Sequence, residues 1–133
     1  MTNGVDPALH VAEFRLSWGE CDPAGIIYYA TYLEWAERVH TEWWLLIGRP
    51  LHPGAPTFVI RHVAVEYLSA PRPMDMLRCE MTLDRIGTTS FTMAFEFTGD
   101  GITVATMSLT AVFVDPEGAA RAVPDDVREL LCA

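Results

Sequence analysis

The chain has 133 residues, half of them hydrophobic, and a formal net charge of −9, which is typical of one domain with a substantial core. Its nine basic residues are all arginines scattered along the sequence, which argues against binding to nucleic acids or anionic membrane surfaces. No apolar run reaches the roughly 18 residues that a membrane span requires, and the N-terminus has no signal-peptide pattern.

The cysteines and histidines indicate a reduced protein without a metal. Cys21, Cys79 and Cys132 are widely spaced and form no CxxC motif, so we expect free thiols and a cytoplasmic location. No two of the four histidines stand at metal-ligand spacing, so we expect no metal site.

The first predicted element is a strand. Residues 1–8 read as a loose tail, and a single domain is expected over residues 9–133. Leu9 to Trp18 alternates between apolar and polar residues, which predicts a half-buried strand. Its apolar face consists of Ala12, Phe14, Leu16 and Trp18.

A turn sequence follows this strand: Glu20-Cys21-Asp22-Pro23-Ala24-Gly25. Because Asp, Pro and Gly are the commonest turn residues, a plain turn is one interpretation. The other is catalytic, since the turn leads to a helix N-terminus with unpaired N–H groups and a positive dipole end. A carboxylate facing backbone donors can attack a carbonyl or activate water against it.

Thr31 to Ile47 is predicted to be a helix that Gly48 and Pro50 bring to an end. Its apolar residues recur at steps of three and four, which predicts a buried stripe. The stripe consists of Tyr32, Ala36, Val39, Trp43 and Leu46, with Trp35 and Trp44 beside it. We interpret the tryptophans as core packing rather than as substrate contacts.

After a turn-rich connector at Leu51 to Pro56, the apolar period changes to two. Four strands are predicted and then one or two final helical turns. The strands are Thr57 to Leu68, Met76 to Ile86, Ser90 to Thr98 and Ile102 to Asp115, and the helical turns fall in Pro124 to Leu131.

The order of these elements predicts an α+β domain. Short connections force neighbouring strands to be antiparallel, and the wide apolar helix must bury itself against the apolar face of their sheet. We therefore expect a five-stranded antiparallel sheet wrapped around one long central helix. Its exposed edges favour pairing with a second copy.

This order and the segment Trp18-Gly-Glu-Cys-Asp-Pro-Ala-Gly-Ile-Ile-Tyr-Tyr29 resemble the hotdog fold and, within it, the 4-hydroxybenzoyl-CoA thioesterase-like family of acyl-CoA thioesterases. Tyr32 and Trp35 extend the match into the helix. Tyr67, Pro71 and Asp75 resemble the family's strand that ends in a proline turn before an acid. The resemblance covers residues 9 to 131.

The resemblance implies a catalytic carboxylate at Asp22, which either attacks the thioester or activates water as general base. It implies that the backbone N–H of Tyr29, at the start of the helix, polarises the thioester carbonyl. It also implies a set of substrate-binding residues: Gly25, Ile27, Tyr28, Glu37, Arg85, Thr89 and Ser90. For Glu37, an ordinary exposed helix glutamate is an equal alternative.

The implied reaction is hydrolysis of an acyl-CoA, such as a hydroxybenzoyl-CoA, to the free acid and coenzyme A. Coenzyme A is then part of the substrate, and no separate cofactor is expected. The resemblance implies a pocket between two subunits, hence a homodimer, and beyond it a tetramer. One departure concerns the hairpin Ile86–Phe91, which lacks the family's run of basic residues. Only Arg85 is basic nearby, so Arg61, Arg72 or another subunit would have to help hold the phosphates.

Four alternatives remain beside an acyl-CoA thioesterase. An acyl carrier protein could be the thioester donor, although two acidic proteins repel each other. A hydratase would need a histidine near Asp22, and the first one that follows it, His40, lies well down the helix. A non-catalytic acyl-binding module would be expected to lack the acid. A Cys21 nucleophile has no histidine partner, and Asp22 beside it would raise its pKa.

Overall fold

A computed structural model of the protein describes residues 8–49 and 57–132. In these two ranges, five strands and two α-helices form one layer of sheet and one of helix. In chain order they are β1 (His10–Arg15), the 3-10 turn η1 (Trp18–Glu20), α1 (Thr31–Leu46), β2 (Thr57–Tyr67), β3 (Met76–Ile86), β4 (Ser90–Gly99), β5 (Ile102–Val114) and α2 (Asp125–Cys132). The predicted connector at 51–56 and nearly all of the predicted tail lie outside the described residues.

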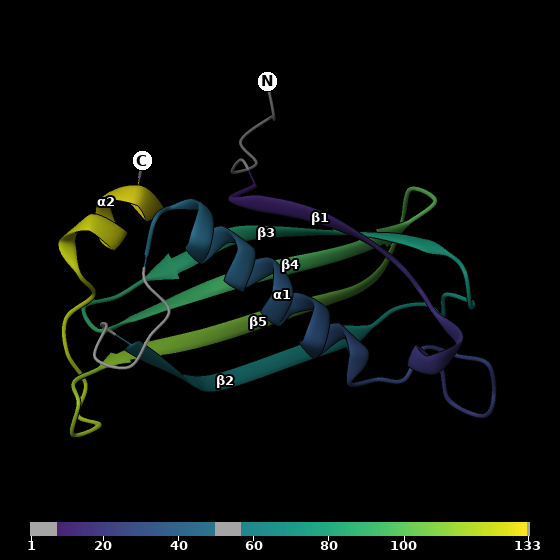
Figure 1. Ribbon diagram of the computed structural model, residues 1–133, viewed down its shortest axis with the longest axis horizontal. Coiled ribbons are helices and arrows are strands. Elements are labelled where there is room, and N and C mark those ends of the chain that lie inside the picture. Colours follow the sequence, from purple (N-terminus) through teal and green to yellow (C-terminus); the bar gives the residue numbers. More distant parts are fainter. Residues whose placement is uncertain (1–7, 50–56, 133) are drawn as a thin grey trace.

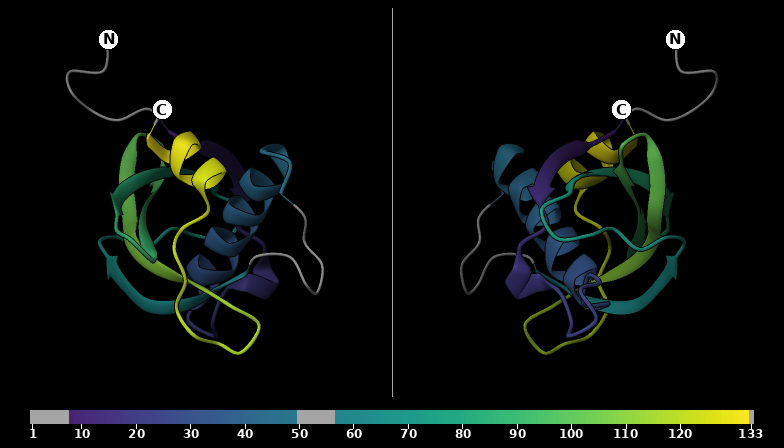
Figure 2. Two further views of the ribbon diagram at one scale, coloured as in Figure 1. Left: turned by 90° about the vertical axis from the view of Figure 1, so that its left-hand side faces the viewer. Right: turned by 90° about the vertical axis from the view of Figure 1, so that its right-hand side faces the viewer.

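The five strands form one antiparallel sheet in the order β1-β3-β4-β5-β2, which confirms the predicted sheet. α1 has 16 residues and lies across one face of this sheet (Figure 1). The end-on views show that the sheet curves around the side that carries α1 (Figure 2). The predicted hotdog fold fits this arrangement.

The core lies between α1 and the concave face of the sheet. The alternating apolar residues of β3 and β4 supply the sheet side, including Leu77, Cys79, Met81, Phe91, Met93, Phe95 and Phe97. Trp35, Trp43 and Trp44 are buried from the helix side. These tryptophans therefore pack in the core, as their spacing predicted.

Two predicted core positions are wrong. Trp18 is 70% exposed, because the alternation stops at Leu16 and the chain then turns into η1. Leu46 is 72% exposed. A period of 3.6 residues carries the buried face of α1 from Trp43 to Ile47, and Ile47 is the residue that packs against the core.

The two ends of the sheet carry different segments (Figure 1). At one end, the η1 turn and the start of α1 lie near the end of β2, where the Tyr32 ring contacts Tyr67. At the other end, the final turns of α1 reach the β3–β4 hairpin, where the Trp44 ring contacts Phe58 and Phe113. The position of any site residue along the sheet therefore decides which others it can meet.

Candidate functional site

The turn between η1 and α1 is closed by its own backbone. The N–H of Asp22 donates to the carbonyl of Ile26 at 2.8 Å, and that of Gly25 donates to the carbonyl of Asp22 at 2.9 Å. Gly25 has a φ of 77° with open space around it, so its role there is conformational. Cys21 and Ile27 form an isolated antiparallel bridge that holds the two arms together.

The Asp22 carboxylate is fixed by this turn but only through one oxygen. Its Oδ1 accepts the backbone N–H of Ala24 at 2.9 Å and that of Ile26 at 3.2 Å. Among the described residues, none donates to its Oδ2. The plain-turn interpretation is thus right about the geometry, and the turn still leaves one carboxylate oxygen free for chemistry.

The first turn of α1 lies a few residues further on and has no side-chain cap at Ala30. The N–H of Thr31 donates to the carbonyl of Tyr28, while the N–H groups of Tyr29 and Ala30 find no acceptor in the part of the chain that the structure describes. Unpaired donors at a helix N-terminus carry its positive dipole end. This is the arrangement that stabilises a developing oxyanion.

Glu20 links the η1 turn to α1 through hydrogen bonds, a role that was not predicted from the sequence. Its Oε1 accepts the N–H and the hydroxyl of Ser17 at 2.9 and 3.0 Å, and its Oε2 accepts Trp35 Nε1 at 3.1 Å. Burial acts to raise the pKa of Glu20, but the hydrogen bonds from Ser17 and Trp35 outweigh it and lower this pKa. The Ser-x-x-Glu spacing of a capping box was the available signal.

Cys21 lies beside Asp22, and its thiol donates to the carbonyl of Ser17 at 3.5 Å. Burial, followed by the charges of Asp22 and Glu20, raises the pKa of this thiol. A thiol with a raised pKa is rarely the thiolate that nucleophilic attack requires.

The other predicted residues near the turn differ in exposure. Ile27 is buried, whereas Tyr28 and Tyr29 are exposed with ring centroids 4.7 Å apart. Glu37 is exposed on α1, where its carboxylate accepts the Thr41 hydroxyl at 2.6 Å. That contact is one an ordinary helix glutamate makes, so the structure gives no sign of a pocket role for Glu37 within one chain.

Arg85, Thr89 and Ser90 lie at the opposite end of the sheet from Asp22. The first residue of β3, Met76, pairs with Arg15 at the end of β1, whereas its last residue, Ile86, leads into the hairpin. A strand of 11 residues is about 35 Å long. One chain therefore does not bring these predicted substrate-binding residues to Asp22.

The hairpin itself is held firmly. Phe113 and Val123 donate backbone N–H groups to the carbonyls of Thr89 and Thr88, both at 2.9 Å. Arg128 of α2 donates to the Gly87 carbonyl at 2.6 Å. Arg85 is exposed beside it.

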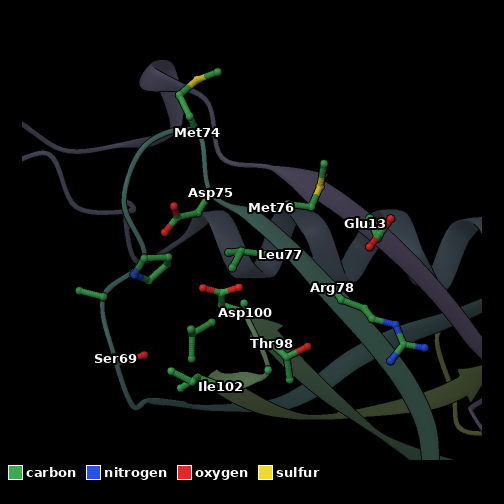
Figure 3. Close-up of a pocket in the computed structure, with 15 residues that line it drawn as sticks. Glu13, Ser69, Met74, Asp75, Met76, Leu77, Arg78, Thr98, Asp100 and Ile102 are labelled. Carbon is green, nitrogen blue, oxygen red and sulfur yellow. The ribbon is translucent and has the colours of Figure 1, made fainter.

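A cavity of about 830 Å³ opens between the β2–β3 connection and the β4–β5 hairpin. Figure 3 shows Asp75, Asp100 and Leu77 around it, with Met74 at the top of the view. None of the predicted site residues lines this cavity. The turn at Asp22 is instead on the surface of a single chain.

Two further findings concern metals and membranes. Within residues 8–49 and 57–132, no three His, Cys, Asp or Glu side chains gather closely enough to hold a metal ion. In the same part of the chain, neither helix has the length and apolar character needed to cross a membrane.

A sequence model of the thioesterase-like superfamily matches residues 16–131. No curated protein matches the chain. Among solved structures, a predicted thioesterase from Bacillus stearothermophilus is 24% identical, with a TM-score of 0.85 over 92% of this chain and 93% of that one.

Two further similar structures are of thioesterases named for their substrates. A 1,4-dihydroxy-2-naphthoyl-CoA thioesterase from Synechocystis is 16% identical, with a TM-score of 0.84 over 92% of this chain and 95% of that one. A gentisyl-coenzyme A thioesterase is 22% identical, with a TM-score of 0.82 over 91% and 98%. At these identities the likeness shows the fold.

Proposed function

The chain belongs to the thioesterase-like superfamily and is a thioester hydrolase, and we propose that it cleaves an acyl-CoA to the free acid and coenzyme A, with Asp22 as the catalytic carboxylate. The observation that carries this assignment is the free Oδ2 of Asp22 in the turn that leads to the uncapped start of α1. The Asp22 carboxylate and the Tyr29 N–H that faces the carbonyl oxygen then both come from the segment between η1 and α1.

The reaction follows one of two routes. As general base, Asp22 takes a proton from water, the hydroxide adds to the thioester carbonyl, and the C–S bond breaks as Asp22 returns the proton to the leaving thiolate, which gives the thiol and the acid. As nucleophile, Asp22 adds to the carbonyl, expels the thiolate to give an anhydride, and water then hydrolyses the anhydride. In both, the Tyr29 N–H accommodates the negative charge on the carbonyl oxygen.

Completion of the site by a second subunit is part of the proposal. β2 is an edge strand, and four of its large apolar side chains are exposed: Val59, Ile60, Val63 and Tyr67. Such an edge invites pairing with another copy. Two-fold antiparallel pairing of β2 with β2 sets the start of one strand beside the end of the other.

This pairing turns the hairpin end of one subunit toward the Asp22 end of its partner. Arg85, Thr89 and Ser90 then become candidates for binding coenzyme A in the partner's site, which accounts for their distance from Asp22 within one chain. Pairing of such dimers into a tetramer is a further expectation.

The substrate class follows from the related structures. Both structures with named substrates are coenzyme A thioesterases, so coenzyme A is the favoured thiol, while the net charge of −9 repels an acidic carrier protein and the anionic coenzyme A alike. Two structural relatives are thioesterases of hydroxylated aryl-CoAs, and an aryl acyl group is accordingly proposed here. The three free cysteines fit a reducing cytoplasm.

The test is release of free thiol from aryl, short-chain, medium-chain and long-chain acyl-CoAs. The Asp22→Asn variant is expected to lose at least about 100-fold in kcat, as removal of a general base does, and Cys21→Ser serves as the matched control with retained activity. If Asp22→Asn stays active, the site assignment is wrong. If the natural protein cleaves nothing in the panel, the proposed substrate class is wrong.

A further inference from the structure

Tyr67 joins the edge strand to the catalytic turn. It is the last residue of β2, and its hydroxyl donates to the backbone carbonyl of Tyr29 at 3.0 Å. The two residues are 38 positions apart in the sequence. This bond is therefore a tertiary link into the short segment that precedes α1.

The Tyr29 carbonyl depends on that link. The first helical N–H groups bond elsewhere, since Thr31 donates to Tyr28 and both Leu33 and Glu34 donate to Ala30. Within the described residues, the Tyr67 hydroxyl is thus the only donor to the Tyr29 carbonyl. A side-chain cap would accept helix N–H groups and none is present at Ala30, so this bond to the Tyr29 carbonyl is the side-chain restraint that the segment has.

The tyrosine is itself rigidly placed. Its backbone pairs with Ala105 of β5, and the next two residues, Leu68 and Ser69, both donate to the Val104 carbonyl. Its ring contacts the ring of Tyr32, with centroids 5.8 Å apart. Because the Tyr67 hydroxyl is anchored by the sheet, it can restrain the peptide unit to which it bonds.

Fixing the carbonyl of Tyr29 also restrains its N–H. Peptide units are planar, so the bond sets the plane that follows the Tyr29 Cα, and the N–H belongs to the plane that precedes the same atom. The Tyr29 N–H can then rotate only relative to a neighbouring peptide plane that the Tyr67 hydroxyl restrains. A donor aimed before the reaction needs no reorganisation when charge develops.

We propose that Tyr67 is a positioning residue for thioester hydrolysis, because its hydroxyl holds the segment that presents the Tyr29 N–H to the substrate carbonyl. The inference rests on the proposed function, in which that N–H is the oxyanion donor. Tyr67 touches neither the reacting carbonyl nor Asp22 in this role. Its effect is expected in the transition state rather than in substrate binding.

The chain offers a matched pair of variants. Tyr67→Phe removes the hydroxyl that bonds Tyr29 and keeps the ring. Tyr32→Phe removes a neighbouring hydroxyl that is buried and has no hydrogen-bond partner among the described residues. Burial raises the pKa of Tyr32 to about 12, so this control removes a neutral group. Removing an unpartnered hydroxyl is nearly neutral for stability.

The first readout is steady-state kinetics on the acyl-CoA that the natural protein cleaves best. We expect Tyr67→Phe to lower kcat about tenfold, the worth of one hydrogen bond, with KM changed less than about twofold. Tyr32→Phe is expected to keep both constants. A rise in KM at constant kcat would overturn the proposal, because it would mean that Tyr67 acts in binding.

The second readout does not depend on catalysis. Amide hydrogen exchange over residues 29–33 is expected to be about tenfold faster in Tyr67→Phe and unchanged in Tyr32→Phe. Unchanged exchange in Tyr67→Phe overturns the proposal whether or not a thioester is cleaved, and faster exchange with an unaltered kcat overturns its catalytic part. If the natural protein cleaves no thioester, the proposed function fails, and exchange alone decides whether Tyr67 orders the turn.

Discussion

His40 is buried among the aromatic rings of Trp43, Trp44, Phe58 and Phe91. Its Nε2 has no hydrogen-bond partner in the described part of the chain. This burial lowers the pKa of His40 to about 4, although the charge of Glu37 acts to raise it. The imidazole is therefore neutral in the folded protein at neutral pH.

Because His40 is held neutral, the free energy of unfolding should decrease as the pH is lowered. An unfolded histidine binds a proton near its ordinary pKa of about 6.5, while folded His40 resists until about pH 4. Between these values the unfolded state binds more protons, so unfolding becomes easier as the pH drops, by about 3 kcal/mol over the whole interval. His40→Phe should remove this contribution.

Urea unfolding of the natural protein and of His40→Phe, measured from pH 7 down to 4, checks this expectation. The variant's free energy of unfolding should decline less over the interval. Parallel pH profiles for the two proteins would show that His40 is not the group responsible.

The turn at Asp22 could be predicted from the sequence because its neighbours are typical turn residues, whereas the catalytic role proposed for this acid came from the family resemblance. Asp22 lies in a local motif, and the structure shows that local backbone donors orient it. Tyr67 could not be assigned its bond in this way, since the partner is 38 residues away and only the register of β2 brings them together. Local chemistry is readable from a sequence, whereas a contact between distant segments requires the fold.

At the scale of elements, the period of each apolar pattern predicted the strands and the helix well. The errors, at Trp18 and Leu46, fall where an element ends and its period no longer applies. The family resemblance placed Arg85, Thr89 and Ser90 in one site with Asp22. The directions of the strands that carry these residues did not enter that prediction. The antiparallel register of β1 and β3 separates them by the length of the sheet.

α2 is the element that holds the β3–β4 hairpin. Arg128 donates to the carbonyls of Gly87 and Thr88 at 2.6 and 3.3 Å, and Asp126 pairs with Arg49, whose guanidinium lies over the Trp44 ring. The last helix thereby connects the hairpin to the end of α1.

Arg128→Ala should loosen this hairpin and lower the free energy of unfolding by about 1–2 kcal/mol, because the partly buried Gly87 carbonyl loses a charged donor. Arg121→Ala is the matched control, since Arg121 is exposed and makes only a backbone hydrogen bond among the described residues. Urea unfolding measures both. Equal stability of the two variants would show that the Arg128 bonds contribute little.

At the scale of the whole molecule, the apolar edge at β2 and the separated site residues have one explanation in the proposed dimer. Val63 of β2 is partly exposed on an edge that no other strand within residues 8–49 and 57–132 covers. A charge at an edge strand opposes pairing. Val63→Glu should therefore give folded monomers that have lost most of their activity.

Sedimentation velocity and the thiol-release assay together check this. Ile102→Glu is the matched control, because Ile102 is also an exposed apolar residue but lies in β5 at the hairpin with β4. It should remain dimeric. The proposed site, with Asp22 from one subunit and the hairpin from its partner, would be contradicted by either of two results. One is a natural protein that sediments as a monomer, and the other is a monomeric Val63→Glu variant with full activity.

The separation of Asp22 from the hairpin by the length of the sheet has a consequence for how this gene can evolve. In the proposed dimer, each active site combines the Asp22 end of one subunit with the hairpin end of the other. Selection on a substitution at either place therefore acts through a site that both subunits form. After gene duplication, one copy could lose its acid and the other its hairpin contacts, and a mixed dimer would keep one working site. Each copy would then need the other, and two genes would maintain what one now encodes.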